Sequence, residues 1–369
     1  MTPRTPSSCV RTVLSLKLQH HRQKAIPFIH HHFVTRIQLI RHHNYATQST
    51  SKPHSRRPLP QIPSQDHAAQ LYPPPKDSSH DGAYTATDNI NPPTSTLPPP
   101  LHLPTRASYP STLTYYFRLG AAYATFYKSG LKSVWHNHQT ARRLKSRIAY
   151  PETPLQAALS GRLSRADLHV LLRSANDMRK LPFFAVLVLV FGEWLPLLVP
   201  FFPRAVPVPC RIPQQILQMR TKTEQRRRDS FRVGVLEPSN LPPSPSGDSW
   251  PILSLQNLNR LLLPLTAPQL RHLATTLDLH PRIPIFLRRR LSTRLHILAI
   301  DDHLLATATK VGGIDVLTLD ELLLACESRG LDTLGVPEAR LRRDLAGWIA
   351  RQERDRGGGG MMMRMLFRR

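Results

Sequence analysis

The chain has 369 residues, 50 of them Lys or Arg against 24 Asp or Glu, and a formal net charge of +26. Such an excess of positive charge favours nucleic acid or an anionic membrane surface as the partner. The cysteines, Cys9, Cys210 and Cys326, have neither metal-binding nor redox spacing. This excludes a disulfide-stabilised scaffold and indicates a reducing compartment.

Residues 1–57 have the composition of a mitochondrial transit peptide, because Lys and Arg recur among Ser, Thr and Leu and the first acidic residue is Asp66. Residues 10–18 can form a short basic amphipathic helix. We expect cleavage downstream of Arg41. Three His clusters could bind metal but lie in the segment expected to be removed, so we expect no metal site and no cofactor. They occupy residues 20–21, 30–32 and 42–43.

Residues 58–112 are rich in Pro, Ser and Thr and include the proline runs 73–75 and 98–100. They contain too few apolar residues to bury a core, which predicts a disordered tether. Residues 113–180 then read as basic amphipathic helices. An aromatic helix over 113–127 should stop at Gly130, and a basic helix should continue to residue 147.

A third helix in this region is predicted to begin at Ser164, with Asp167 at the capping-box position, and to run into Pro182. Residues 181–202 follow, apolar except for Glu193, and at ~1.5 Å per residue they are long enough to cross a hydrocarbon core of roughly 30 Å. We therefore expect a single transmembrane helix. The alternative is a buried helical hairpin bent at Pro196.

Glu193 is the candidate proton- or ion-carrying group of that segment. A carboxylate at such depth is unfavourable when ionised, so it should be protonated, paired, or directed at a partner helix or a wet cavity. The alternative is a neutral acid hydrogen-bonded to backbone that Pro196 leaves free.

Residues 203–250 form a basic segment followed by a Pro- and Ser-rich linker, and residues 251–355 read as an all-helical domain. Thr318 and Glu321 form a predicted capping box for a helix that ends at Gly330, and Pro337 occupies the first position of the next helix. The apolar face of that last helix is Leu341, Leu345, Trp348 and Ile349. Residues 356–369, glycine-rich and then Met- and Arg-rich, are expected to be a flexible tail.

These residues resemble the leucine-zipper and EF-hand-containing transmembrane (LETM) family of the mitochondrial inner membrane, over roughly residues 113–349. In the membrane segment the resemblance is carried by Leu181, Pro182, Phe183, Glu193, Pro196, Phe202, Pro203 and Pro207. In the C-terminal domain it is carried by Phe286, Leu287, Arg288, Leu291, Arg294, Leu295, Asp301, Asp302, Gly313, Asp315, Leu317, Glu321, Leu322, Ala325, Cys326, Arg329, Gly330, Gly335, Leu341, Arg342, Leu345 and Trp348.

The resemblance implies an all-helical, 14-3-3-like ribosome-binding domain in the matrix, tethered to the inner membrane by one span. The chain departs from the family at Val190 and Gly192, lacks a residue between Glu193 and Pro196, and has no spacing typical of an EF-hand loop. The long coiled coil that follows the membrane segment in the family is reduced here to residues 211–232 plus a loop. We therefore expect a divergent, truncated member without calcium sensing through such a loop.

Two function classes compete. As a binding module, the protein would contact the mitochondrial ribosome through a stripe of arginines, and the alternative for that stripe is a solvated helix face. The candidate contact residues are Arg288, Arg289, Arg290 and Arg294. As a component of proton-coupled potassium or calcium exchange, the protein would use Glu193 and would have to form a homo-oligomer, because one span cannot make a pathway.

A third reading treats residues 321–348 as a DNA-binding helix-loop-helix similar to the SAP motif. No arrangement of residues indicates an enzyme, since there is no nucleophile elbow and no phosphate-binding glycine loop. Asp301 and Asp302 are expected to cap or to pair with Arg294 and its neighbours rather than to bind metal.

Overall fold

The computed structural model describes residues 89–106, 111–191, 204–239, 254–279, 286–308, 313–354 and 360–368. Within these ranges the protein is all-helical and has no strand, as the sequence predicts. All of them belong to one unit, Leu59–Arg369. The expected transit peptide, its His clusters and the Pro- and Ser-rich linker from residue 240 onward lie outside the described residues.

The first long element is α3 (Thr112–Lys145), and it passes through Gly130 without a break. The predicted stop at Gly130 is therefore wrong. A Cβ built on Gly130 would lie 2.6 Å from the carbonyl oxygen of Pro209 and 3.0 Å from the sulfur of Cys210. The glycine is needed for the close approach of the 3-10 turn η5 (Val208–Cys210), not for helix termination.

Two further helices, α4 (Pro154–Leu159) and α5 (Arg165–Phe191), pack against α3. The capping box that the sequence predicts for α5 is confirmed. The backbone N–H of Asp167 donates to Ser164 Oγ at 3.1 Å, and the N–H of Ser164 donates to Asp167 Oδ2 at 3.3 Å. The helix continues beyond Pro182, which lies in its interior.

The C-terminal helices share one apolar core, assembled from Leu, Ile, Met and Trp side chains spaced three and four residues apart. Thr318 is the N-cap of α11, but its side chain makes no capping hydrogen bond, so the predicted capping box with Glu321 is wrong. Pro337 stands directly before α12, one residue ahead of the predicted first position. The elements are α7 (Pro213–Arg232), α8 (Leu255–Leu262), α9 (Ala267–Thr276), α10 (Leu287–Ala308), the 3-10 turn η8 (Gly313–Val316), α11 (Leu319–Ser328), α12 (Glu338–Arg354) and α13 (Gly360–Phe367).

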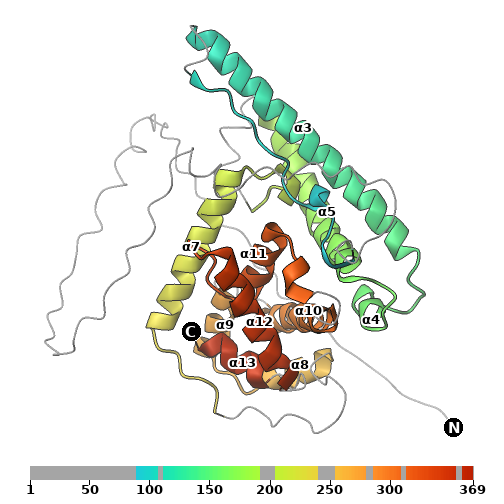
Figure 1. The fold of residues 1–369 in the computed structure, drawn as a ribbon, viewed down its shortest axis with the longest axis vertical. Helices are drawn as coiled ribbons and strands as arrows, with labels where there is room; N and C mark the ends of the chain where they lie inside the picture. Colours follow the sequence, from blue (N-terminus) through green and yellow to red (C-terminus); the bar gives the residue numbers. More distant parts are fainter. Residues whose placement is uncertain are drawn as a thin grey trace, which may run out of the picture. The chain divides into compact units, whose positions relative to one another are not determined.

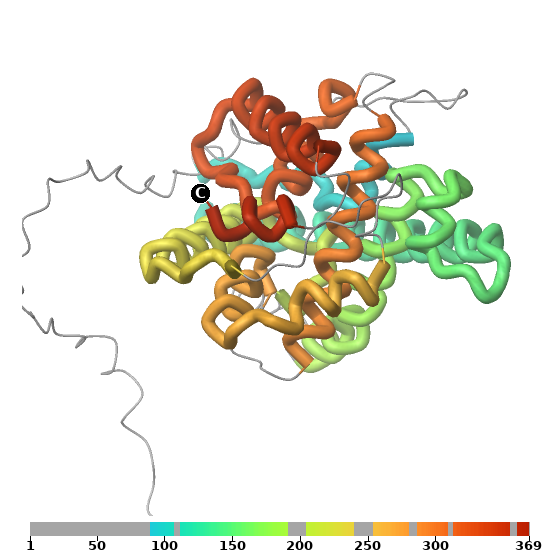
Figure 2. The backbone as a smooth tube through the Cα atoms, turned by 90° about the horizontal axis from the view of Figure 1, so that it is seen from below, coloured from blue at the N-terminus to red at the C-terminus, as the bar shows by residue number. Residues whose placement is uncertain are grey.

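Helix α10 connects the two helical groups (Figures 1 and 2). One of its faces lies in the C-terminal core with α8, α9 and α12, while Ile300 packs into a second cluster built by α3, α4 and α5. The basic helices before residue 181 and the helices after residue 254 are therefore packed together.

Two segments expected to be disordered are ordered where the structure describes them. In the predicted tether, Ile90 is buried and the Asn91 side chain donates to the carbonyl of Val316 at 2.8 Å. In the predicted flexible tail, Met362, Met363, Leu366 and Phe367 are buried on one face of α13 against the C-terminal core. Both expectations rested on composition alone. A single buried apolar side chain and a side-chain hydrogen bond attach the first segment, and an apolar helix face attaches the second.

Residues of α5 contact the described residues that follow the predicted membrane segment. The backbone N–H of Val208 donates to Asp177 Oδ1 at 2.9 Å, and Phe184 and Leu187 of α5 pack with Val206 and Cys210. The expected single span over residues 181–202 lies partly outside the described residues, and nothing in the described part supports it. Separately, none of the described helices is long and apolar enough to cross a membrane.

Candidate functional site

The predicted arginine stripe lies in the first part of α10, and its four arginines differ in exposure. Arg288 and Arg289 are exposed, whereas Arg290 and Arg294 are half-buried. Arg288 donates a 3.3 Å hydrogen bond to the carbonyl of Leu265, in the turn between α8 and α9, which holds its side chain against that turn. Only the first two arginines are therefore exposed to a partner, and this bond holds Arg288 in place.

Phe286 stands beside them and was not singled out as a site residue by the sequence analysis. Its side chain is 72% exposed, and its backbone has φ +53°, in the left-handed region that a bulky residue rarely adopts. Its carbonyl accepts the hydrogen bond of the Arg290 N–H at 2.9 Å, so Phe286 stands at the N-terminus of α10. We call Phe286, Arg288 and Arg289 the α10 patch.

The positive charges at the beginning of α10 do not stabilise the helix. Arg288, Arg289 and Arg290 lie in the first turn of α10, which contains no acidic residue. Positive side chains at a helix N-terminus oppose the helix dipole by roughly 0.3–1 kcal/mol each, and they also repel one another. A phosphate bound there would reverse both effects, and an exposed aromatic ring beside guanidinium groups is typical of surfaces that stack bases.

Arg294 belongs to the interior instead. Burial lowers its pKa, and the charges of Asp278 and Asp301 act in the opposite direction. The predicted pairing of Asp301 and Asp302 with Arg294 is also not what the structure has. Both aspartates bind Arg329, whose Nε donates to Asp302 Oδ1 at 2.8 Å and whose Nη2 donates to Asp301 Oδ2 at 2.9 Å.

A buried ionic cluster thus joins α5, α10 and α11. Arg165 of α5 donates from Nε to Asp301 Oδ1 at 2.7 Å, and His169 Nε2 lies 2.8 Å from the same oxygen. Burial alone would raise the pKa of Asp301, but Arg165, Arg329 and His169 outweigh it and hold that pKa well below its usual value. Asp301 is therefore a structural anion, whereas burial and the neighbouring Asp301 raise the pKa of Asp302. The oxygens of both aspartates already have partners.

The other family-motif residues of the C-terminal region surround this cluster. The indole N–H of Trp348 donates to Asp302 Oδ2 at 3.0 Å. Gly330 has φ +77°, and a Cβ there would lie 2.7 Å from Cγ2 of Thr276. Both residues are thus required by packing.

The candidates near the apolar segment are described only in part. Pro182 and Phe183 lie in α5 with exposed side chains. Glu193, Pro196 and Pro203 lie outside the described residues. Just before the segment, burial and the nearby Arg211 lower the pKa of Lys180 to about 8, and burial raises the pKa of Asp177.

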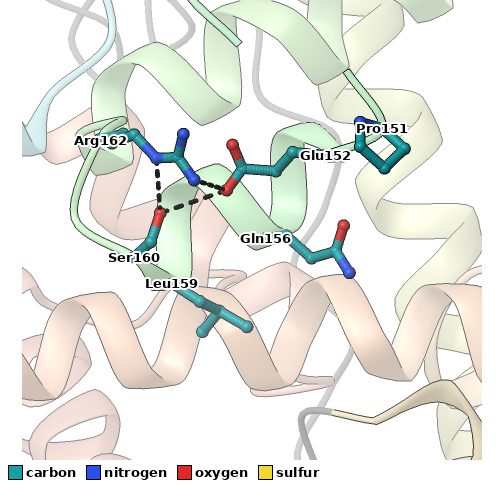
Figure 3. A pocket seen from close by; sticks show the side chains of 6 residues that line it. All are labelled: Pro151, Glu152, Gln156, Leu159, Ser160 and Arg162. Carbon is teal, nitrogen blue, oxygen red and sulfur yellow. Dashed lines mark hydrogen bonds and ion pairs between the residues drawn. The ribbon is translucent and has the colours of Figure 1, made fainter. Parts of the chain in front are cut away.

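An open depression of about 600 Å³ lies beside α4 (Figure 3). Its charged residues neutralise each other, since Arg162 forms an ion pair with Glu152, and Ser160 Oγ donates to the same carboxylate at 3.3 Å. The lining is completed by Pro151, Gln156 and Leu159. In the ranges that the structure describes, no group of three or more His, Cys, Asp or Glu residues is placed to hold a metal ion.

Two protein-family models match the chain. The family described as "Pentamidine resistance factor domain" matches residues 107–307, more than half of the chain, and "LETM1-like, RBD" matches residues 254–362. The chain belongs to the pentamidine resistance factor family and is a divergent LETM-family member.

A LETM-family relative from Drosophila melanogaster, named "Mitochondrial proton/calcium exchanger protein", is 29% identical over 246 residues. The match covers 58% of this chain and 24% of the relative, so the chain spans about a quarter of that protein's length. No solved structure matches the chain.

Proposed function

We propose that this LETM-family protein is attached to the mitochondrial inner membrane and binds the mitochondrial ribosome through its helical region 251–355, which faces the matrix. In this role it supports translation or membrane-protein insertion and, through these, mitochondrial ion homeostasis. Residues 1–57 serve as its transit peptide. The observation that carries the proposal is the exposed α10 patch, which lies inside the stretch matched as LETM1-like, RBD.

The chemistry of the patch fits ribosomal RNA better than a protein surface. Arg288 and Arg289 are free of carboxylate partners in the described structure, whereas many other arginines of the protein, including Arg165, Arg173 and Arg329, are paired with acids. Exposed guanidinium groups bind phosphates by releasing counterions, and Phe286 adds a face on which an unpaired base can stack.

The experiment that tests this is purification of the full-length tagged protein from detergent-solubilised mitochondria, with the bound RNA and proteins identified. Ribosomal RNA and ribosomal proteins should be recovered together with the wild type and be reduced with the variant R288A/R289A. Equal recovery with both proteins would contradict a role for the α10 patch.

Ion exchange is the second candidate, supported by the name of the Drosophila relative. Glu193 would be the proton-carrying group, because burial in an apolar segment raises the pKa of a carboxyl towards neutrality. Flux of calcium or potassium against a pH gradient, measured in proteoliposomes, should then be abolished by Glu193→Gln. Exchange by this route would require a homo-oligomer, because one apolar segment per chain cannot enclose an ion pathway.

A further inference from the structure

We propose that the protein is inserted into the bilayer from one side only, through a continuous apolar surface formed by the N-terminal half of α3 and the C-terminal half of α5. Everything described before the apolar segment and everything described after it would then lie on the same side of the membrane. The inference rests on the membrane attachment proposed above but not on ribosome binding.

The first step is that the chain on either side of the segment is held together by buried contacts. Arg173 of α5 binds Glu321 of α11 through two hydrogen bonds of 2.7 and 2.8 Å, and Arg165 binds Asp301 of α10. These two ion pairs connect residues before position 181 to residues after position 254. They cannot form across a hydrocarbon core of roughly 30 Å.

The second step is that the apolar surface lies at one end of a helix pair. Ala141 and Leu144 of α3 cluster with Leu168 and Leu171 of α5, while Tyr127 packs on Phe184 with ring centroids 6.4 Å apart. The two helices are therefore antiparallel. The beginning of α3 and the end of α5 therefore lie at the same end of the helix pair (Figure 1).

The third step is the amount of apolar surface exposed at that end. On α5, Leu189 is 86% exposed, and on α3, Phe117 is 77% exposed. The exposed large apolar side chains of this end are Leu113, Tyr116, Phe117, Phe183, Val186, Val188, Leu189 and Val190. In sequence, the α5 part continues directly into the apolar residues that follow position 191. A patch of this kind marks a protein or membrane contact.

The charges beside the apolar surface favour a phospholipid bilayer as its partner. No acidic residue occurs from Asn89 to Pro151, a range that includes all of α3. Lys128 and Lys132 are exposed on α3 directly after its apolar half, where they can reach anionic headgroups. Arg118, the one charge inside that half, is exposed and has a stem long enough for its guanidinium to reach the interface.

The test uses the full-length chain with two reporter cysteines, one on each side of the apolar segment. Tyr150 and Leu236 are 99% and 82% exposed and suit this purpose as Y150C and L236C. Cys9 is replaced by Ser. Cys210 and Cys326 can remain, because both are buried and burial raises the pKa of each thiol to about 12, so they do not react at neutral pH.

The protein is reconstituted into sealed vesicles of phosphatidylcholine and cardiolipin and treated with a membrane-impermeant polyethylene-glycol maleimide. If both reporters lie on one side, every molecule carries either no label or two labels, whichever way it is oriented. If the segment crosses once, every molecule carries one label. A predominantly singly labelled population would overturn the proposal, and ribosome binding by the α10 patch would be unaffected by that result.

A second measurement tests the occupant. A bimane fluorophore on F117C should lose most of its emission in vesicles containing nitroxide-labelled lipid, while the same fluorophore on Y150C should keep most of its emission. A second copy of the chain covering the surface would shield F117C from maleimide without lipid quenching. That outcome, or failure of the protein to associate with the vesicles, would contradict bilayer contact.

Discussion

Asp177 of α5 accepts a 2.9 Å hydrogen bond from the backbone N–H of Val208, which lies 31 residues later and beyond the whole apolar segment. Asp177 is buried, and so are Val206 and Cys210 on the other side of this contact. The chain thus returns to the helix it left, and the turn that follows, η5, is fitted against α3 at Gly130. This junction fixes the end of α5 and the beginning of α7 in one place.

The junction should be sensitive to a single added methyl group at Gly130. Gly130→Ala would place a Cβ 2.6 Å from the backbone oxygen of Pro209, which cannot move as a flexible side chain would. We expect a loss of about 1–3 kcal/mol in the free energy of unfolding, measured by urea denaturation.

Gly120 offers a matched control in the same helix. A Cβ at Gly120 meets nothing within 4 Å, so Gly120→Ala should stabilise the protein by up to about 1 kcal/mol through helix propensity alone. Equal effects of the two substitutions would show that Gly130 is not required for the close approach of η5.

Arg329 should be among the most sensitive positions of the fold. Arg329→Ala would leave Asp301 and Asp302 buried without their shared counter-charge, although Arg165 still faces Asp301. Removing one partner of a buried ion pair typically lowers the free energy of unfolding by about 3–5 kcal/mol. The exposed Arg340, paired with Asp344 at 3.6 Å, is the control, and Arg340→Ala should change stability by less than about 1 kcal/mol.

The lowered pKa of Glu321 should make the stability of the protein depend on pH. Burial alone would raise its pKa, but Arg173 outweighs burial and lowers it. A carboxyl with a lowered pKa contributes stability above its unfolded pKa and loses it as the pH falls through its folded pKa. Glu321→Gln should therefore destabilise the protein at pH 7, and the difference from wild type should shrink below about pH 4. Urea unfolding at a series of pH values measures this.

The exposed Glu353 on α12 provides the comparison, since Glu353→Gln should have little effect at any pH. A difference between wild type and Glu321→Gln that stays constant down to acid pH would show that the ionised carboxylate is not what Arg173 holds.

A substitution at Phe286 can distinguish a role in stability from a role in binding ribosomal RNA. The φ of +53° at this residue is unfavourable for phenylalanine by roughly 1 kcal/mol and free of strain for glycine. Phe286→Gly should therefore leave stability unchanged or raise it slightly, yet weaken binding to ribosomal RNA because the stacking ring is lost. A variant that folds less well and binds equally would show that the ring serves packing.

Much of the fold was predictable where a local signal was sufficient. Ser164 and Asp167 satisfy each other's backbone groups, Pro337 precedes α12, and Leu341, Leu345, Trp348 and Ile349 are buried on one face as their spacing indicates. Gly330 ends α11 as expected, and its positive φ explains why a glycine is there.

Local signals failed where a distant partner decided the outcome. Glu321 was assigned to a capping box with Thr318, but Thr318 makes no side-chain cap and Glu321 instead binds Arg173, 148 residues away. The same holds for Gly130. Its sequence context predicts a helix stop, but in the structure it allows the backbone of Pro209 to approach α3 closely. Neither Arg173 nor Pro209 could be recognised as the partner from spacing alone.

The candidate site was predictable in position and not in detail. The sequence points to the arginines at the beginning of α10, but only the structure separates the exposed Arg288 and Arg289 from the half-buried Arg290 and Arg294. Phe286 could have been noticed only as an aromatic residue next to a basic run, because its exposure follows from a backbone conformation that its side chain does not predict.

The most direct test of ribosome binding is its salt dependence, measured by co-sedimentation of purified ribosomes with wild type, R288A/R289A and the control R340A/R343A. The control removes the same charge from exposed positions on α12. If the α10 patch contacts phosphates, R288A/R289A should bind more weakly and reduce the slope of log affinity against log salt by roughly 1.4–1.8, while the control keeps the wild-type slope. Equal slopes for R288A/R289A and wild type would contradict the account.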